Sequence, residues 1–177
     1  MQINTLINLH KKKFDKFYIN ILNKKLDNSL LSKAMKYSSV DGGKRIRAFL
    51  VSQSSKMVKL SNENAMVISS SIESIHSYSL IHDDLPSMDN DDFRRGKQSN
   101  HKKFGEARAI LAGDALHDFA FQLISKNLKN INPKYNLKLI NYLTKCTGHE
   151  GLAGGQSLDL LYENKNLSKN KIVEMYN

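Results

Sequence analysis

Apolar residues recur along most of the chain at spacings of three and four, the repeat that gathers side chains on one face of an α-helix. The pattern is clearest over residues 67–79 and 110–124. Alternation with a period of two, which is typical of half-buried strands, is not evident, and only Pro86 and Pro133 interrupt the chain. The sequence therefore predicts an all-α fold.

The predicted helices begin and end where capping residues, prolines or glycines change this pattern. Ser61 is a candidate amino-terminal cap for one helix, and Asn132 followed by Pro133 is a candidate start for another. A weak point is expected at residues 148–155, where glycines gather. The predicted helices cover residues 4–25, 28–38, 43–60, 62–85, 104–128, 133–163 and 168–177.

The length and apolar content suit one domain spanning residues 1–177. The last predicted helix starts near Ser168 and has run about two turns when the sequence stops. We therefore expect a single all-α domain that is truncated at its carboxy terminus.

The chain carries a formal net charge of +10, from 27 basic and 17 acidic residues. Lysine supplies 22 of the basic residues and asparagine occurs 18 times, so much of the charge reflects a general bias in composition. Nucleic-acid binders carry basic stripes interleaved with aromatic residues, a pattern that this sequence lacks. The five arginines are more informative, because four of them form two close pairs, at positions 45 and 47 and at 94 and 95.

The sequence also bears on the compartment. A single cysteine, Cys146, cannot form an internal disulfide and suits a reducing environment. The first residues place an apolar stretch before positive charge, the reverse of a secretory signal, and no apolar run reaches the ~18 residues of a spanning helix. We expect a cytoplasmic protein without membrane insertion, with Cys146 as a small core residue.

The densest chemistry lies in five carboxylates within ten positions: Asp83, Asp84, Asp89, Asp91 and Asp92. The first two close a predicted helix, where the helix dipole disfavours negative charge, so helix stability does not account for them. Mg²⁺ would offset the repulsion, since it takes one or two carboxylates and leaves positions for water and substrate phosphate. The alternative is a solvated acidic loop that pairs with Arg94 and Arg95. A calcium-binding EF-hand is disfavoured, because its glycine and ligand spacing are absent.

A second anion site is predicted around Gly43, Lys44 and Arg47. Glycine at the start of a predicted helix permits close approach of phosphate to backbone N–H groups. Lys44 and Arg47, three residues apart, would share one helical face, with Arg45 turned away. The alternative is a basic first turn with no ligand.

His76 lies seven residues before Asp83, so both residues lie on the same face of one predicted helix, about 10 Å apart along its axis. This helix would present a phosphate donor and metal-binding carboxylates to one cavity. Taken alone, His76 is more simply interpreted as a semi-buried structural histidine.

Together these residues resemble the trans-prenyl (polyprenyl) diphosphate synthase family, in particular its bacterial farnesyl diphosphate synthase type. The resemblance runs from about residue 40 to residue 160 and is most specific in the block from the aspartates to the arginines. The matching segments are 42–47, His76, 80–97, 105–107, 111–116 and 154–159, in that order.

The resemblance implies an isoprenoid synthase helical bundle around a central cavity, usually as a homodimer. The implied reaction condenses isopentenyl diphosphate with dimethylallyl or geranyl diphosphate to give farnesyl diphosphate. The implied catalytic residues are Asp83, Asp84 and Asp89, which bind Mg²⁺ and the allylic diphosphate, and Arg94, which binds the allylic diphosphate. The implied isopentenyl diphosphate site comprises Lys44, Arg47, His76 and Arg95. With Gly43 and Arg94 these are the expected substrate-binding residues.

Product length is expected to depend on Tyr78 and Ser79. Tyr78 lies five residues before Asp83, and in the family bulk near this position acts as a floor for the growing isoprenoid tail. The alternative is that Tyr78 packs in the core or at a subunit contact.

Some features depart from the family pattern. Ala48 stands where the family often has proline, and Asp118 introduces charge where the family usually runs apolar, which suggests a solvent or subunit surface. No carboxylate cluster comparable to the family's second aspartate-rich motif follows Asp92. We therefore expect poor turnover, and an inactive fragment or a non-catalytic partner subunit is the alternative. A terpene cyclase would need only one diphosphate site, which Lys44 and Arg47 argue against.

Overall fold

The computed structural model describes residues 2–40 and 43–176. The chain divides into two compact units, unit 1 up to Lys129 and unit 2 from Asn130 onward, and each is described by itself. Helices dominate both units, which confirms the predicted all-α class. The single domain spanning residues 1–177 stays a prediction.

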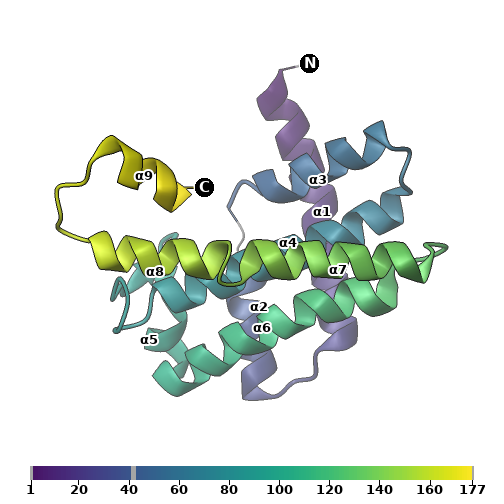
Figure 1. Ribbon diagram of the computed structural model, residues 1–177. Helices are drawn as coiled ribbons and strands as arrows, with labels where there is room; N and C mark the ends of the chain where they lie inside the picture. Colours follow the sequence, from purple (N-terminus) through teal and green to yellow (C-terminus); the bar gives the residue numbers. More distant parts are fainter. Residues whose placement is uncertain (1, 41–42, 177) are drawn as a thin grey trace. The chain divides into compact units, whose positions relative to one another are not determined.

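Unit 1 is built around two long antiparallel helices, α4 (Asn62–Asp83) and α6 (Glu106–Asn127), which pack side by side (Figure 1). Leu116 and Leu123 of α6 are fully buried, as is Tyr18, whose hydroxyl lies 2.7 Å from that of Ser74. The predicted cap is confirmed, because the Ser61 side chain accepts a hydrogen bond from a backbone N–H at the start of α4. The helices of unit 1 are α1 (Ile3–Lys25), α2 (Leu30–Val40), α3 (Ile46–Met57), α4 (Asn62–Asp83), α5 (Asn100–Phe104) and α6 (Glu106–Asn127).

A short hairpin that the periodicity did not predict follows α4. Its strands are β1 (Phe93–Arg94) and β2 (Lys97–Gln98), which pair antiparallel. The two residues between them have positive φ, 54° at Arg95 and 79° at Gly96, as the tight hairpin turn with two left-handed residues requires. Strands of two residues are too short to show an alternating pattern.

The predictions for unit 1 differ from the structure at two further places. The helix predicted over 104–128 is α6, which agrees within two residues, but the short α5 before it was not predicted and is separated from α6 by Gly105, which has a φ of 88°. The helix predicted over 43–60 begins only at Ile46. Gly43 and Lys44 therefore precede α3, whereas Asp41 and Gly42 lie outside the described residues.

Unit 2 contains α7 (Pro133–Thr147), α8 (Leu152–Tyr162) and α9 (Lys169–Tyr176). The start of α7 is as predicted, with the Asn132 side chain accepting a hydrogen bond from the backbone N–H of Lys134. The predicted weak point is a true break between α7 and α8. Cys146 is exposed, so its prediction as a core residue is wrong. In the part of the chain that the structure describes, no helix is long and apolar enough to cross a membrane.

Candidate functional site

The carboxylates of Asp83 and Asp89 are brought together where α4 ends. The backbone N–H of Asp89 donates to the carbonyl of Asp83 at 2.9 Å, so the turn after the helix folds back on its last residue. Asp83 is half-buried and Asp89 is exposed. Burial, and then the negative charge of Asp89, raise the pKa of Asp83. Two neighbouring carboxylates of which one is partly desolvated create a local demand for positive charge.

This pair fits Mg²⁺ as an incomplete set of ligands. Oxygen donors from one or two carboxylates are what Mg²⁺ commonly takes from a protein when substrate phosphates complete its coordination. Among residues 2–40 and 43–176, no three His, Cys, Asp or Glu side chains are grouped as a ready-made metal cage. The arrangement therefore suits a cation that arrives together with a phosphate-bearing ligand.

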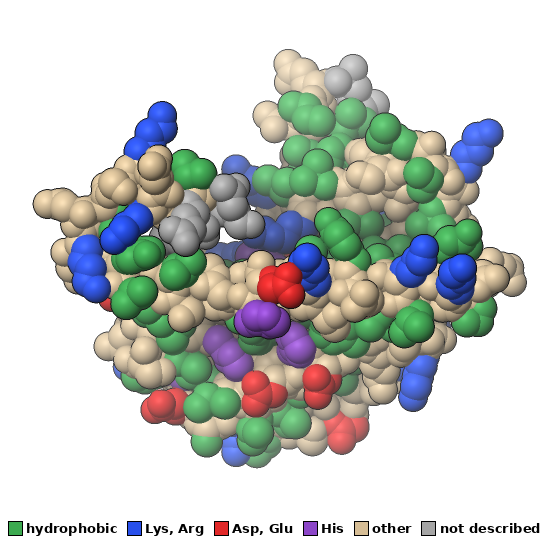
Figure 2. Space-filling model, in the orientation of Figure 1, with side chains coloured by type: hydrophobic (Ala, Val, Ile, Leu, Met, Phe, Trp, Pro, Cys, Tyr) green, Lys and Arg blue, Asp and Glu red, His purple; other side chains and the backbone are tan. Residues whose placement is uncertain are grey.

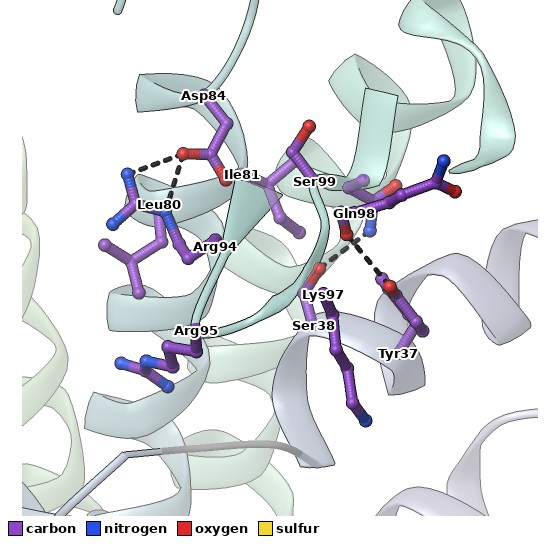
Figure 3. Close-up of a pocket in the computed structure, with 11 residues that line it drawn as sticks. Tyr37, Ser38, Leu80, Ile81, Asp84, Arg94, Arg95, Lys97, Gln98 and Ser99 are labelled. Atoms are coloured by element: carbon purple, nitrogen blue, oxygen red, sulfur yellow. Dashed lines mark hydrogen bonds and ion pairs between the residues drawn. The ribbon is translucent and has the colours of Figure 1, made fainter. Parts of the chain in front are cut away.

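Asp84, the third predicted metal ligand, is engaged differently. It is 3% exposed, and its Oδ1 accepts from Nε of Arg94 at 2.6 Å and contacts Nη2 of Arg94 at 2.5 Å (Figure 3). Arg94 also reaches Asp91 at 3.5 Å. Asp84 thus fixes the guanidinium of Arg94 at the edge of the site rather than offering a free carboxylate.

The hairpin that carries Arg94 is anchored to α2. The hydroxyl of Tyr37 donates to the carbonyl of Gln98 at 2.9 Å, and the amide of Asn100 donates to the Ser38 hydroxyl at 2.8 Å (Figure 3). The same amide donates to the carbonyl of Ala34 at 2.9 Å. These contacts hold β1 and β2 beside the end of α4. Arg94 and Arg95 therefore lie on a hairpin that is fixed to α2.

The predicted second anion site is brought together, although not by the predicted helix. Lys44 and Arg47 do not share a helical face, because α3 starts after Lys44, but both side chains are exposed. A Cβ placed on Gly43 would lie 3.2 Å from Cζ of Arg95, so the glycine lets the backbone approach this guanidinium closely. A segment before α3 and the turn of the hairpin therefore meet.

His76 of α4 belongs to the same cluster. Burial, and then the positive charge of Arg47, lower the pKa of His76 to about 4, and Arg95 and Arg45 act in the same direction. At neutral pH the ring is therefore uncharged and can donate one N–H to an anion. The grouped cations indicate a site for a ligand with several negative charges.

We expect His76 to make the protein sensitive to acid. Its pKa is 6.5 in the unfolded chain and about 4 in the fold, so the unfolded state takes up a proton first as the pH falls. The stability associated with neutral His76 is fully present above pH 6.5 and is lost as the pH falls toward 4. The thermal unfolding midpoint, measured from pH 4 to 7, should fall less steeply for His76→Gln than for the wild-type chain. Parallel profiles would contradict this assignment.

Tyr78 and Ser79 face different surroundings. Tyr78 is half-buried between α4 and α6, with edge-to-face contacts to His82 and His117 at centroid distances of 5.0 Å and 5.2 Å. The hydroxyl of Ser79 donates to the backbone carbonyl of His76 at 3.0 Å. Tyr78 thus supplies bulk one to two turns before the carboxylates, whereas Ser79 is occupied by its own helix.

The outer face of α6 is polar near Tyr78. Figure 2 shows acidic and histidine side chains close together where Figure 1 places α6. The side chain of Asp118 is 88% exposed and that of Asp114 is 60% exposed, with Asp114 3.8 Å from His82. Asp118 therefore lies on an open surface of unit 1, consistent with the expected solvent or subunit surface.

Comparisons with known proteins agree with this geometry. Residues 28–177 match the family model described as polyprenyl synthetase. A farnesyl diphosphate synthase of Geobacillus stearothermophilus is 50% identical over 143 residues, which are 80% of this chain and 48% of the relative. One from Buchnera aphidicola of Acyrthosiphon pisum is 48% identical over 151 residues, which are 84% of this chain and 54% of the relative. The chain spans about half the length of these curated relatives.

Solved structures give the same result. A geranyltransferase from Legionella pneumophila superposes with a TM-score of 0.90 at 34% identity, covering 98% of this chain and 62% of the other. An FPP/GFPP synthase from Zymomonas mobilis superposes with a TM-score of 0.89 at 36% identity, covering 97% of this chain and 63% of the other.

Proposed function

Because the chain belongs to the polyprenyl synthetase family, we propose that it is a Mg²⁺-dependent prenyltransferase that condenses isopentenyl diphosphate with an allylic diphosphate to give farnesyl diphosphate. The allylic substrate would be dimethylallyl or geranyl diphosphate. The observation that carries this proposal is the presence of two different clusters along one helix, α4: one of cations with His76, and one of carboxylates. His76 of the cationic cluster and Asp83 of the carboxylate cluster are seven residues apart, about 10 Å along the helix axis.

Each cluster suits one substrate. Asp83 and Asp89 would hold Mg²⁺ against the allylic diphosphate, and Arg94, oriented by Asp84, would bind the same diphosphate with its planar fork. The isopentenyl diphosphate would be bound by the cationic cluster of Gly43, Lys44, Arg47, His76 and Arg95. A terpene cyclase needs only the first of these sites, so the second cluster favours a synthase.

The chemistry follows from charge placement. Held by Asp83 and Asp89, Mg²⁺ would supply positive charge beside the leaving diphosphate. The allylic carbon–oxygen bond breaks with its electrons going to the diphosphate, where Arg94 stabilises the developing charge. The cationic cluster holds isopentenyl diphosphate so that its double bond meets the allylic carbon. A proton then leaves the new chain, with the released diphosphate as the base that the resemblance implies.

A product assay tests the proposal. The purified chain would be incubated with labelled isopentenyl diphosphate, dimethylallyl diphosphate and Mg²⁺, and the products separated by chain length. A fifteen-carbon product supports the proposal, even at the poor turnover that is expected of this chain. Binding of both diphosphates without product supports the alternative of an inactive fragment or a non-catalytic partner subunit. Binding of neither diphosphate contradicts both functions.

Product length provides a further prediction. Replacing Tyr78 with alanine would remove the bulk that the rings of His82 and His117 hold between α4 and α6. The expected result is a longer product than farnesyl diphosphate, whereas Tyr78→Phe should keep the original length because it keeps the ring. Chromatography of the products distinguishes the two. The same chain length from Tyr78→Ala and the wild type would exclude Tyr78 as the residue that limits the tail.

The homodimer implied by the resemblance is part of the same proposal. Light scattering of the purified chain, which gives its molar mass in solution, tests it directly.

A further inference from the structure

An arginine with several hydrogen bonds, Arg45, lies inside the fold rather than in the proposed site. Arg45 is 4% exposed and has a φ of 54°, a left-handed conformation that residues other than glycine keep only where their surroundings hold it. The sequence predicted that it turns away from the anion site, and its side chain does point into the interior. Its Cζ lies 5.4 Å from the ring centroid of Phe14 and 5.5 Å from that of Tyr18.

The guanidinium of Arg45 connects three helices. Its Nε donates to Oδ1 of Asp15 in α1 at 2.8 Å, and its Nη1 donates to Oε2 of Glu73 in α4 at 3.0 Å. Its Nη2 donates to the carbonyls of Ser39 at 2.7 Å and Val40 at 3.3 Å, in the last turn of α2. A cation at the carboxyl end of a helix satisfies carbonyls that lack partners within the helix. One side chain therefore fixes the end of α2, where the segment leading to α3 departs.

Glu73 binds the first turn of α3 as well as Arg45. It is 3% exposed, and its second oxygen, Oε1, accepts from the backbone N–H of Ala48 at 3.1 Å. This N–H belongs to the first turn of α3, which has no partner for it within the helix. Proline, which the family often has at this position, could not make this contact. Glu73 thus holds both the residue that caps α3 and the first turn of the helix.

The exposed cations of the second anion site lie on either side of this buried pair. Lys44 immediately precedes Arg45, Arg47 follows two residues later, and His76 lies one turn after Glu73 on α4. Arg47 is close enough to lower the pKa of His76. Any displacement of Arg45 would therefore move Lys44 and Arg47 relative to His76.

We propose that Arg45 and Glu73 are positioning residues for the isopentenyl diphosphate site. The buried pair fixes the segment that carries Lys44 and Arg47 against α4, and neither residue touches the ligand. This inference rests on the proposed function. It distinguishes the two diphosphate sites, because Asp83 and Asp89 are held by the turn at the end of α4 and Arg94 is held by Asp84. The side-chain contacts of Arg45 are with Asp15, Glu73 and the last carbonyls of α2.

The test is a pair of binding measurements on a charge-free double variant, Arg45→Met with Glu73→Leu. Removing both charges together leaves neither one buried without its partner, so the fold should persist. Asp15 keeps its ion pair with Lys11. We expect isopentenyl diphosphate to bind about tenfold more weakly or worse, because the segment is no longer fixed. The Mg²⁺-dependent affinity for a non-reactive allylic diphosphate analogue should change by less than about twofold, since its residues keep their own supports.

Two further variants keep the test decisive. Arg45→Lys retains the charge but not the planar fork that reaches Asp15, Glu73 and the α2 carbonyls. It should therefore not bind isopentenyl diphosphate with the wild-type affinity. Glu73→Gln keeps an acceptor for the Ala48 N–H and should weaken isopentenyl diphosphate binding less than the double variant does. It serves as the test if the double variant fails to fold.

The outcomes distinguish the positioning role of Arg45 and Glu73 from the proposed function. Unchanged isopentenyl diphosphate affinity in a folded variant overturns the positioning role and leaves the proposed function intact. Equal losses of affinity for both ligands also overturn it, because they indicate a general structural effect. A wild-type chain that binds no isopentenyl diphosphate overturns both.

Discussion

Replacing Arg94 with methionine is expected to destabilise unit 1 by about 3 kcal/mol, because it leaves the buried carboxylate of Asp84 without its partner. The side chain of Asp84 is 4% exposed and that of Arg94 is 31% exposed, so most of the cost is the desolvated aspartate. The variant should also lose its affinity for the allylic diphosphate analogue, since it lacks the guanidinium of Arg94. Urea unfolding measures the first effect and calorimetry the second.

The matched control adds Asp84→Leu to Arg94→Met. Removing both charges relieves the buried carboxylate, so the free energy of unfolding should return to near the wild-type value, while analogue binding stays lost. Recovery of binding together with stability would show that Arg94 has no direct role in the site. A double variant as unstable as the single one would show that the ion pair is not the source of the loss.

Replacing Asp83 and Asp89 together with asparagine should lower the Mg²⁺-dependent affinity for the allylic analogue by about 100-fold or more, since losing even an outer-shell partner costs 10- to 100-fold at metal sites. The same double variant should be at least as stable as the wild type when Mg²⁺ is absent. The pKa of Asp83 is raised in the fold, so the free energy of unfolding falls as the pH rises and Asp83 ionises. Asparagine does not ionise and removes this loss of stability. Without Mg²⁺ the variant should therefore melt at the same temperature as the wild type or slightly higher.

Asp92→Asn is the control for this charge change. Asp92 belongs to the same acidic segment, but its carboxylate pairs with Lys102 at 2.8 Å. Its replacement should leave Mg²⁺-dependent binding within about twofold of the wild type. If Asp92→Asn weakens binding as much as the double variant, the segment acts through its total charge and not through two specific ligands.

The sequence predicted the chemical groups of the site better than their roles. The carboxylates, the arginine pair and His76 stand out by density and spacing, and the helix that joins them, α4, was predicted within two residues of its end. The engagement of Asp84 by Arg94 could not be predicted, because it depends on a hairpin turn whose strands are two residues long. Local patterns carry little information about so short an element.

The predicted geometry of the basic segment is wrong. Its grouping in sequence suggested a helical face, but Arg45 in a left-handed conformation starts the helix after Lys44. Arg45 points inward, where it binds Asp15, Glu73 and the last carbonyls of α2, and Glu73 lies 28 residues farther along the chain. Glu73 lies among serines on its helix face, so the sequence beside it does not indicate the arginine that it binds, and long-range pairing decided what local spacing could not.

The central claim is that one chain binds two diphosphates at different sites, of which only one depends on metal. Calorimetry of the wild-type chain tests it, with the non-reactive allylic analogue added first and isopentenyl diphosphate second, each with and without Mg²⁺. The account predicts one equivalent of each ligand per chain, with the analogue binding tightly only when Mg²⁺ is present and isopentenyl diphosphate binding to the saturated complex. Competition between the two ligands for one site, or equal analogue affinity without Mg²⁺, would contradict it.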